Sequence, residues 1–238
     1  MAQGLTAAVA VSHRTRRPRR YVGQTGDVIV GRVKEVGNKR WKLDISGPQD
    51  GVLMLSSVNL PGNQQRRRNA EDQLQMRSFF SENDLVSAEV QETRRDGQVM
   101  LHTRSNKYGK LHYGVLCRVL PSLMKRLPQH FQTLPCGVDA IFGMNGFIWL
   151  SPPTEAEQED GAMDLEGEEE TMTWRERVCR VRNAIQLLAE AFAQIAPAAI
   201  MAIYEESLTM SLHPKHLLDP AHSEHLLKHA RAAVPIDQ

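Results

Sequence analysis

Five short runs in which apolar residues alternate with polar ones limit the fold of this chain more than any other feature. The runs occupy residues 28–36, 41–45, 52–55, 85–90 and 99–101. A period of two predicts strands, and Asp96-Gly97 predicts a hairpin turn between the last two. We expect a bend or bulge near Gly31, and a polar helical insertion at residues 63–79. Five strands interrupted after the third are typical of an OB-fold barrel, although a sandwich with more strands remains an alternative.

The second half of the chain begins with strand-like runs and ends with helical patterns. Runs at residues 115–120, 138–142 and 147–150 predict three strands. Gly143-Met144-Asn145-Gly146 contains an Asn-Gly pair and predicts the turn between the last two strands. Strands followed by helices indicate a compact α+β domain.

One long helix is predicted from Trp174, because apolar residues recur from there every three or four positions. Thr173 and Glu176 have the spacing of a capping box, and Pro197 is expected to end the helix. A face of this length more often packs on a sheet than in a coiled coil. Two further helices are expected at residues 198–208 and 214–234.

The net charge of +1 hides an asymmetry between the two parts of the chain. Residues 1–150 hold 22 Lys and Arg against 12 Asp and Glu, whereas residues 151–238 hold 7 against 16. The basic part favours a polyanionic partner, most often nucleic acid, over a basic surface that only aids solubility. Residues 155–170 carry nine acids, which indicates a solvated loop or linker rather than a metal site.

Signals for catalysis, metal binding or membrane insertion are weak. Cys117, Cys136 and Cys179 form no CxxC pair, which argues against zinc and disulfides and fits a reducing compartment. No apolar run is long enough to cross a membrane, and no serine-hydrolase, Walker or HExxH motif occurs. The histidine pairs spaced by three, at residues 213 and 216 and at 222 and 225, are interpreted as surface residues. We therefore expect no catalytic residue, no metal, no cofactor and no small-molecule substrate.

Basic and aromatic residues gather at the tip of the first predicted hairpin. The tip residues are Lys39, Arg40, Trp41 and Lys42. Cations that contact phosphates and rings that stack on bases together hold single-stranded RNA, and this part of an OB-fold is its usual nucleic-acid face. Trp41 also alternates with Leu43, so it has an alternative interpretation as a core residue.

Two further basic groups are candidate RNA contacts. Arg66, Arg67 and Arg68 lie on the predicted insertion. Arg104, Lys107 and Lys110 lie at the junction between the two halves. Three adjacent arginines cannot share one helix face, so some of them must face solvent or a partner. A solvated surface is the alternative for both groups.

Long stretches of residues 20–150 resemble the ribosomal RNA-processing protein 4 family of exosome cap subunits. These stretches are "GDVIVGRVKEVGNKRWKLDI", "LMLSSVNLPGNQQRRRNAEDQLQMRSFF", "LVSAEVQ", "LHTRSNKYGKLHYG", "LPCGV" and "GMNGFIWL". The C-terminal helices fit more loosely, around "RNAIQLL" and "YEESL". Gly143, Asn145 and Gly146 match the family's G-x-N-G pattern, which we interpret as a structural turn because it lies between strands rather than between helices.

The resemblance implies a mainly β domain followed by an α+β domain. Residues 1–22 would be a disordered basic tail, 23–105 an S1-type OB barrel, and 106–238 a KH-type domain with an acidic flexible loop at 153–171 and C-terminal helices. The implied function is a non-catalytic RNA-binding cap subunit that guides 3′ ends into the RNA exosome for 3′→5′ rRNA processing and RNA degradation. The alternatives are a stand-alone S1/KH RNA-binding protein and a hydrolase that uses the acidic loop and a metal.

The implied partners are single-stranded RNA and the other ring and cap subunits, and the implied locations are nucleus, nucleolus and cytoplasm. Family members carry a further N-terminal domain that helps dock on the ring. This chain has an Arg-rich segment there, "RTRRPRR" at residues 14–20, so we expect ring docking to be less secure than RNA binding. The same segment fits a nuclear-import patch, a mitochondrial transit peptide, an RNA-binding tail or a tail without an address.

Overall fold

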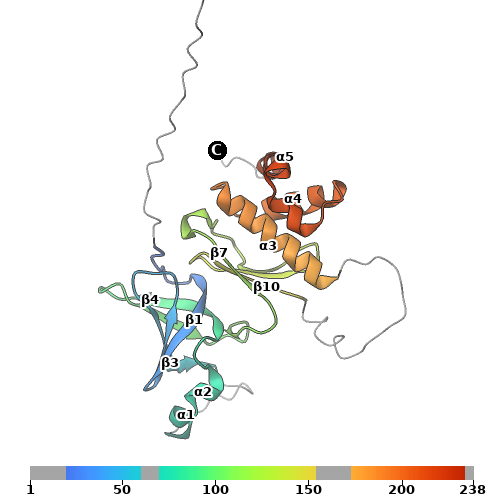
Figure 1. Cartoon of the computed structure of the whole chain (residues 1–238). Helices are drawn as coiled ribbons and strands as arrows, with labels where there is room; N and C mark the ends of the chain where they lie inside the picture. Colours follow the sequence, from blue (N-terminus) through green and yellow to red (C-terminus); the bar gives the residue numbers. More distant parts are fainter. Residues whose placement is uncertain (1–19, 60–69, 154–172, 234–238) are drawn as a thin grey trace, which may run out of the picture.

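The computed structural model describes residues 20–59, 70–153 and 173–233, and its N-terminal part is a closed five-stranded barrel (Figure 1). The barrel strands are β1 (Val28–Gly37), β2 (Arg40–Asp44), β3 (Gly51–Val58), β4 (Leu85–Thr93) and β5 (Val99–Thr103). They follow the order β1-β2-β3-β5-β4, and β4 pairs back with β1. Only the contact between β3 and β5 is parallel among these pairings. The OB-fold prediction is therefore confirmed.

The irregularity in β1 lies three residues beyond the predicted position. The pairing of β1 with β2 shifts register between Val33 and Glu35, which identifies a bulge at Lys34. Gly31 itself keeps regular register with Val86. Its small size instead allows a close approach, because a Cβ atom there would lie 3.1 Å from the Leu43 side chain. The predicted bulge of this strand is therefore present, three residues beyond Gly31.

Two short helices and one extra strand extend the barrel. The helices α1 (Ala70–Leu74) and α2 (Met76–Phe79) precede β4, so the described part of the predicted insertion is helical. Figure 1 places them at the end of the barrel farthest from the C-terminal helices. Strand β6 (Gly109–Lys110) pairs with β4. The barrel sheet thus extends beyond the expected domain boundary between residues 105 and 106.

The second domain is built on a four-stranded antiparallel sheet in the order β7-β10-β9-β8. Its strands are β7 (Val115–Arg118), β8 (Phe131–Thr133), β9 (Asp139–Phe142) and β10 (Phe147–Ser151), and the 3₁₀ helix η1 (Pro121–Leu123) follows β7. Strand β8 was not expected, because its short sequence carries no clear alternation. The Asn-Gly turn lies between β9 and β10, as predicted.

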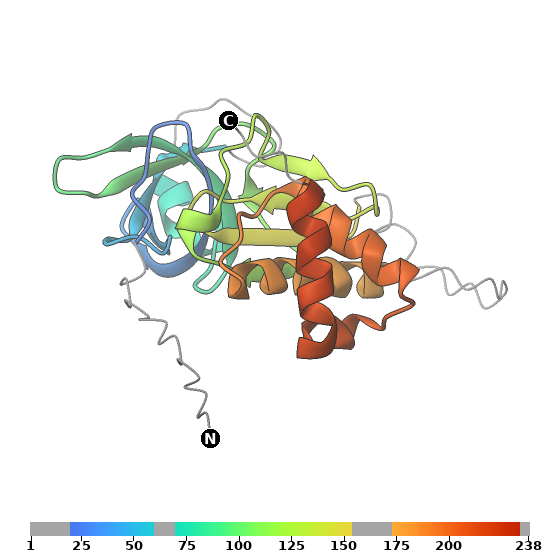
Figure 2. The same cartoon turned by 90° about the horizontal axis from the view of Figure 1, so that it is seen from above.

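Helices cover one face of this sheet. They are α3 (Trp174–Glu190), α4 (Pro197–Thr209), the 3₁₀ helix η3 (Pro214–Leu218) and α5 (Pro220–Ala233). Figure 1 shows α3 lying across the sheet with α4 and α5 beyond it, and Figure 2 shows the same stack from above. The KH-type α+β prediction is confirmed. None of the helices in the described residues is long and apolar enough to span a membrane.

The predicted start of α3 is confirmed, but its predicted end is wrong. The Thr173 hydroxyl accepts a hydrogen bond from the Glu176 backbone N–H, which is the expected cap. The helix stops at Glu190, because Phe192 adopts a left-handed conformation with φ 52°. Pro197 begins the next helix instead of ending this one, which is the position where proline is favoured.

The expected single helix over residues 214–234 is divided into two parts. Asp219 is extended, with φ −67° and ψ 133°, and separates η3 from α5. The cause is Pro220, because a proline disfavours helical geometry at the residue before it. The break lets α5 turn and pack against α4, where Leu226 and Ala230 are buried.

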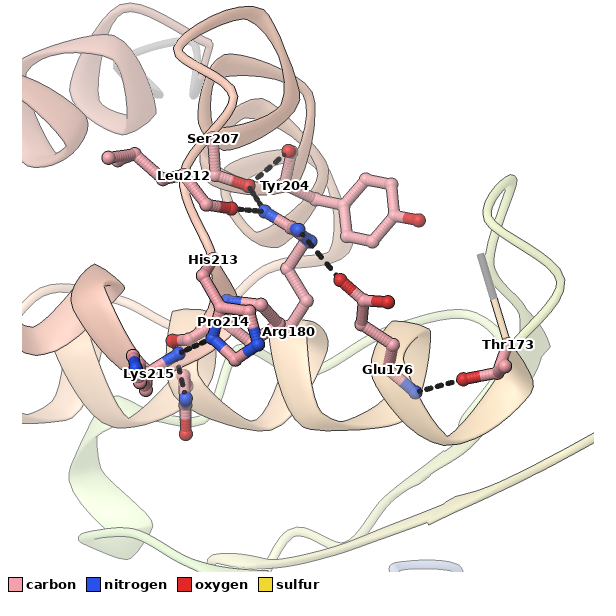
Figure 3. A network of polar contacts seen from close by, with 10 residues as sticks. Thr173, Glu176, Arg180, Tyr204, Ser207, Leu212, His213, Pro214 and Lys215 are labelled. Atoms are coloured by element: carbon pink, nitrogen blue, oxygen red, sulfur yellow. Dashed lines mark hydrogen bonds and ion pairs between the residues drawn. The ribbon is translucent and has the colours of Figure 1, made fainter. Parts of the chain in front are cut away.

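A buried arginine connects α3 to the later helices (Figure 3). Arg180 is 3% exposed, and its Nη1 donates to Ser207 Oγ at 2.9 Å and to the Leu212 carbonyl at 2.7 Å. Its Nη2 lies 3.4 Å from Glu176, one turn earlier on α3. Asn183 adds a 2.9 Å bond from its amide to the Pro214 carbonyl. A charged group so deeply buried requires such partners, and they align α3, α4 and η3.

The turn between β9 and β10 connects the two domains. Asn145 is fully buried, and its Nδ2 donates to the backbone carbonyls of Val30 at 2.7 Å and Ile45 at 3.1 Å. Gly146 has φ +83°, and a Cβ on it would meet the Val119 carbonyl at 2.3 Å. A Cβ on Gly143 would lie 2.4 Å from the Phe147 carbonyl. The two glycines of the G-x-N-G pattern are therefore required because a Cβ atom would clash, and Asn145 is required for its hydrogen bonds across the domain junction.

An ion pair and an apolar cluster complete the junction. The Asp27 carboxylate, only 4% exposed, accepts from Arg126 Nη2 at 2.5 Å and from the Tyr21 hydroxyl at 2.7 Å. Burial and this hydrogen bond raise the pKa of Tyr21, so it remains a donor. Val30 packs with Phe147 and Trp149 of β10. These contacts hold the barrel and the KH-type sheet in one arrangement.

Candidate nucleic-acid interface

The hairpin between β1 and β2 presents two cations to solvent. Gly37 pairs with Arg40, so Asn38 and Lys39 form a two-residue turn. Lys39 has φ 59°, a left-handed conformation that is uncommon for residues other than glycine. Lys39 and Arg40 are both exposed, and neither forms an ion pair with an acid in the described part of the chain. Both positive charges are therefore available to a phosphate.

Lys42 has an acidic partner on the same sheet. Its Nζ lies 2.7 Å from Glu35 Oε2, and the hydrogen bond from Lys42 lowers the pKa of Glu35. The pair is exposed, so it contributes little to stability. It does partly neutralise one of the three hairpin cations predicted to contact RNA.

Trp41 is a core residue, and its assignment to the RNA-binding surface is wrong. The side chain is 0% exposed and packs edge-on against Phe80, with ring centroids 5.3 Å apart. Its indole Nε1 donates to the Phe80 carbonyl at 2.9 Å. Alternation with Leu43 and Ile45 directs all three side chains into the closed barrel. No ring face remains for a base to stack on.

Arg104 lies toward the same end of the barrel as the hairpin tip. Arg40 pairs with Met54, and Thr103, which precedes Arg104, pairs with Val58. These two positions on β3 are about 13 Å apart at the usual rise of about 3.3 Å per residue. Arg104 is exposed. The end of the barrel at which β3 finishes thus carries Lys39, Arg40 and Arg104.

Lys107 lies in a polar cleft of about 400 Å³ between the two domains. Its Nζ lies 4.8 Å from the ring centre of Tyr108 and 5.6 Å from that of Phe131, which begins β8. The Tyr108 hydroxyl donates to Glu89 at 2.6 Å, and burial and that bond raise the pKa of Tyr108. The cleft combines a cation with a half-buried ring, that of Phe131, at its edge. Such a combination suits a nucleotide.

Lys110 has an acidic partner, and the three arginines of the predicted insertion are not described. Lys110 lies 2.7 Å from Asp84 in an ion pair beside β6. Arg66, Arg67 and Arg68 lie outside the described residues, so their predicted role remains a prediction. In the basic group at the junction, Arg104 thus lies at the barrel end, Lys107 lies in the cleft, and Lys110 is paired with Asp84.

Two cleft residues were not identified from the sequence. Phe131 and His130 lie after a loop that carries no alternating pattern, and they reach Lys107 only because the KH-type domain folds back on the barrel. The stretch "KYGKLHYG" pointed to the junction but not to its partner across the cleft. The rings of Tyr108 and Phe131, whose centres are 5.6 Å apart, come into contact only in the folded chain, so the sequence pattern does not reveal this pair.

A closed S1-type barrel whose sheet leads directly into a KH-type sheet defines a two-domain protein of the S1–KH class. Models of the RRP4 S1 domain and of the KH domain match residues 20–92 and 114–156. The exosome complex component RRP4 of Bos taurus is 47% identical over 213 residues, which cover 89% of this chain and 72% of that protein. The Saccharomyces cerevisiae protein of the same name is 41% identical, covering 81% of this chain and 64% of its own length. The chain belongs to the RRP4 family.

A solved structure shows the same fold at greater distance. It is a crystal structure assigned to an exosome complex RNA-binding protein, with a TM-score of 0.53 and 22% identity. The match covers 81% of this chain and 99% of that one. The order of barrel, sheet and helices therefore persists where the sequence has changed at most positions.

Proposed function

We propose that this chain is a non-catalytic RNA-binding subunit of the cap of an RNA exosome. In this role it guides the 3′ ends of single-stranded RNA into the complex for 3′→5′ processing and degradation, including rRNA maturation. The observation that carries the proposal is its 47% identity, over 89% of its length, with an exosome complex component. The partners are the other ring and cap subunits, and the places of action are nucleus, nucleolus and cytoplasm.

The exposed cations support the RNA-binding part of this proposal. Lys39, Arg40 and Arg104 lie toward one end of the barrel and face solvent. Positive groups spaced along a surface bind the phosphates of a single strand without selecting a sequence, which suits a subunit that passes many RNAs. Lys107 and Phe131 extend the candidate surface toward the KH-type domain.

Co-purification at native expression tests the assembly part. A cap subunit is recovered with ring subunits at a stoichiometric ratio, and the complex survives a salt wash that removes RNA. Recovery of the chain alone, with RNA binding intact, would favour the stand-alone RNA-binding protein instead.

A nuclease assay tests the non-catalytic part. The purified chain is incubated with end-labelled single-stranded RNA and magnesium, and we expect binding without shortening of the RNA. Cleavage that disappears when the acids of residues 155–170 are replaced would contradict the proposal and support the hydrolase alternative.

A further inference from the structure

Three side chains of residue types that bind metals converge, from two helices, on the side of the molecule formed by the C-terminal helices. Glu206 lies on α4, and His225 and His229 lie on α5. The two histidines are four residues apart, so they project from one face of α5 on successive turns. One ligand atom from each of the three lies within 4.8 Å of the others. The spacing of the histidines in the sequence does not identify this group, because Glu206 joins it only when α4 packs against α5.

The carboxylate of Glu206 already contacts both imidazoles. His225 Nε2 lies 2.9 Å from Glu206 Oε1, and His229 Nδ1 lies 3.6 Å from Glu206 Oε2. The two imidazole ring centres are 5.1 Å apart. Each carboxylate oxygen of Glu206 thus faces a nitrogen of a different histidine. The possible metal-binding atoms of the three side chains therefore lie in one small volume.

We propose that Glu206, His225 and His229 form a binding site for a divalent transition-metal ion of the zinc type. Two imidazoles and a carboxylate are the protein ligands of known three-ligand zinc sites, and a water molecule completes the tetrahedron. Imidazole nitrogen favours zinc, copper, nickel or iron over magnesium and calcium, which prefer oxygen.

The distances fit this assignment after small side-chain movements. Tetrahedral ligands at about 2.0–2.1 Å from zinc lie about 3.4 Å from one another. The observed contacts of 2.9 and 3.6 Å lie on either side of that value. No separation in the group exceeds 4.8 Å, so none must close by more than roughly 1.4 Å. Rotation of two imidazoles that are each about half exposed can supply this movement without a backbone shift.

The backbone beneath the three ligands is held by packing. Ser207, next to Glu206, is fully buried, and its hydroxyl takes part in the Arg180 network. Leu226 and Ala230, which follow His225 and His229, are buried at 0% and 2% exposure. The ligands therefore stand on helix faces with fixed spacing, which is the condition for a pre-organised metal site.

A bound ion would join α4 to α5 across their exposed edge. Helix α5 contributes two fully buried side chains, Leu226 and Ala230, to the helical layer. An ion that binds the folded chain and not the unfolded one stabilises the fold as its concentration rises. We therefore expect the attachment of α5 to become metal-dependent. This inference does not depend on RNA binding or on exosome assembly.

Calorimetric titration of the full chain with zinc ion alone tests the site. The protein is first treated with a chelator and dialysed. The variants are E206Q, H229A and the double substitution H225A/H229A, all at partly exposed positions. The controls are H222A, which alters a histidine on the same helix outside the cluster, and H216A, which removes a separate histidine–carboxylate pair with Asp219.

The proposal predicts one site in the unmodified chain and in both controls. Loss of one ligand should weaken zinc binding by at least about tenfold, since even the loss of a residue that only orients a ligand costs about 10–100-fold. Zinc should also raise the thermal midpoint of the unmodified chain and leave that of H225A/H229A unchanged. Cobalt in place of zinc should show the visible absorption of a tetrahedral site, absent in the double variant. Equal zinc affinity in the unmodified chain and H225A/H229A, or no saturable binding in either, would overturn the proposal.

Discussion

The Nδ2 atom of Asn145 donates a 2.7 Å hydrogen bond to the carbonyl of Val30, a residue 115 positions earlier in the chain. The bond joins the β9–β10 turn to the first strand of the barrel. The same nitrogen reaches Ile45, just after the second strand, and the backbone N–H of Met144 donates to Val28 at 2.9 Å. The G-x-N-G pattern thus serves as the connection between the two domains, and its Gly143, Asn145 and Gly146 are buried rather than presented to RNA.

Asn145→Ala should destabilise the domain junction. The change leaves two buried carbonyls and the Val30 N–H without their side-chain partner, which costs about 1–3 kcal/mol in the free energy of unfolding. Urea denaturation followed by circular dichroism measures this loss. Asn38→Ala, in the exposed hairpin turn, serves as the control and should change the free energy by less than about 0.5 kcal/mol. Equal stability of the two variants would contradict a structural role for Asn145.

Replacing Trp41 should affect folding rather than RNA binding. Trp41→Ala removes a fully buried ring and should lower the free energy of unfolding by about 3–5 kcal/mol. Trp41→Phe retains an aromatic ring in the core and should cost less. RNA affinity of the folded Trp41→Phe protein, measured by fluorescence anisotropy, should equal that of the unmodified chain. A selective loss of RNA affinity with unchanged stability would restore the stacking interpretation.

Lys39 and Arg40, which have no acidic partner among the residues that the structure describes, should carry phosphate contacts. K39A/R40A should weaken binding to a single-stranded RNA and reduce the slope of log affinity against log salt by about 0.7 per lost contact, hence about 1.4 for two. The matched control is R94A/R95A, which removes the same charge from the β4–β5 hairpin. The register of β5 against β3 places that hairpin at the opposite end of the barrel. Equal effects of the two double variants would mean that net charge, not position, governs binding.

Arg180 should stabilise the helical layer. Arg180→Met keeps much of the side-chain volume but leaves the Leu212 carbonyl and the Ser207 hydroxyl without their donor. We expect a loss of about 1–3 kcal/mol in the free energy of unfolding and faster hydrogen exchange in α4. Arg182→Met on the exposed side of α3 is the control. Identical exchange rates in the two variants would argue against the network shown in Figure 3.

The three cysteines should differ in their rates of alkylation. Cys117 is buried, and burial raises the pKa of its thiol to about 12, so almost no thiolate forms at pH 8. Burial also raises the pKa of the half-buried Cys136. Cys179 is exposed and should react first. Peptide mapping by mass spectrometry measures the order, and all three should react at similar rates in denaturant. Early modification of Cys117 in the folded protein would show that the KH-type core opens readily.

Much of the architecture followed from local patterns. Period-two runs predicted all five barrel strands, and Thr173 predicted the start of α3, because such signals act over a few neighbouring residues. The errors were local as well. The left-handed Phe192 ended α3 early, and the bulge predicted near Gly31 formed three residues later, at Lys34.

The sequence by itself determined the types and order of the elements, the basic character of the first half, and the fact that Trp41 shares a face with Leu43. Only the tertiary structure decided that this face points into the barrel, that Lys42 and Lys110 have acidic partners while Lys39 and Arg40 have none in the described part of the chain, and that Glu206 meets two histidines. The physical reason is the distance along the chain over which each property is determined. Backbone periodicity is set by adjacent residues, whereas burial and ion pairing depend on which distant segments the closed barrel and the packed helices bring into contact.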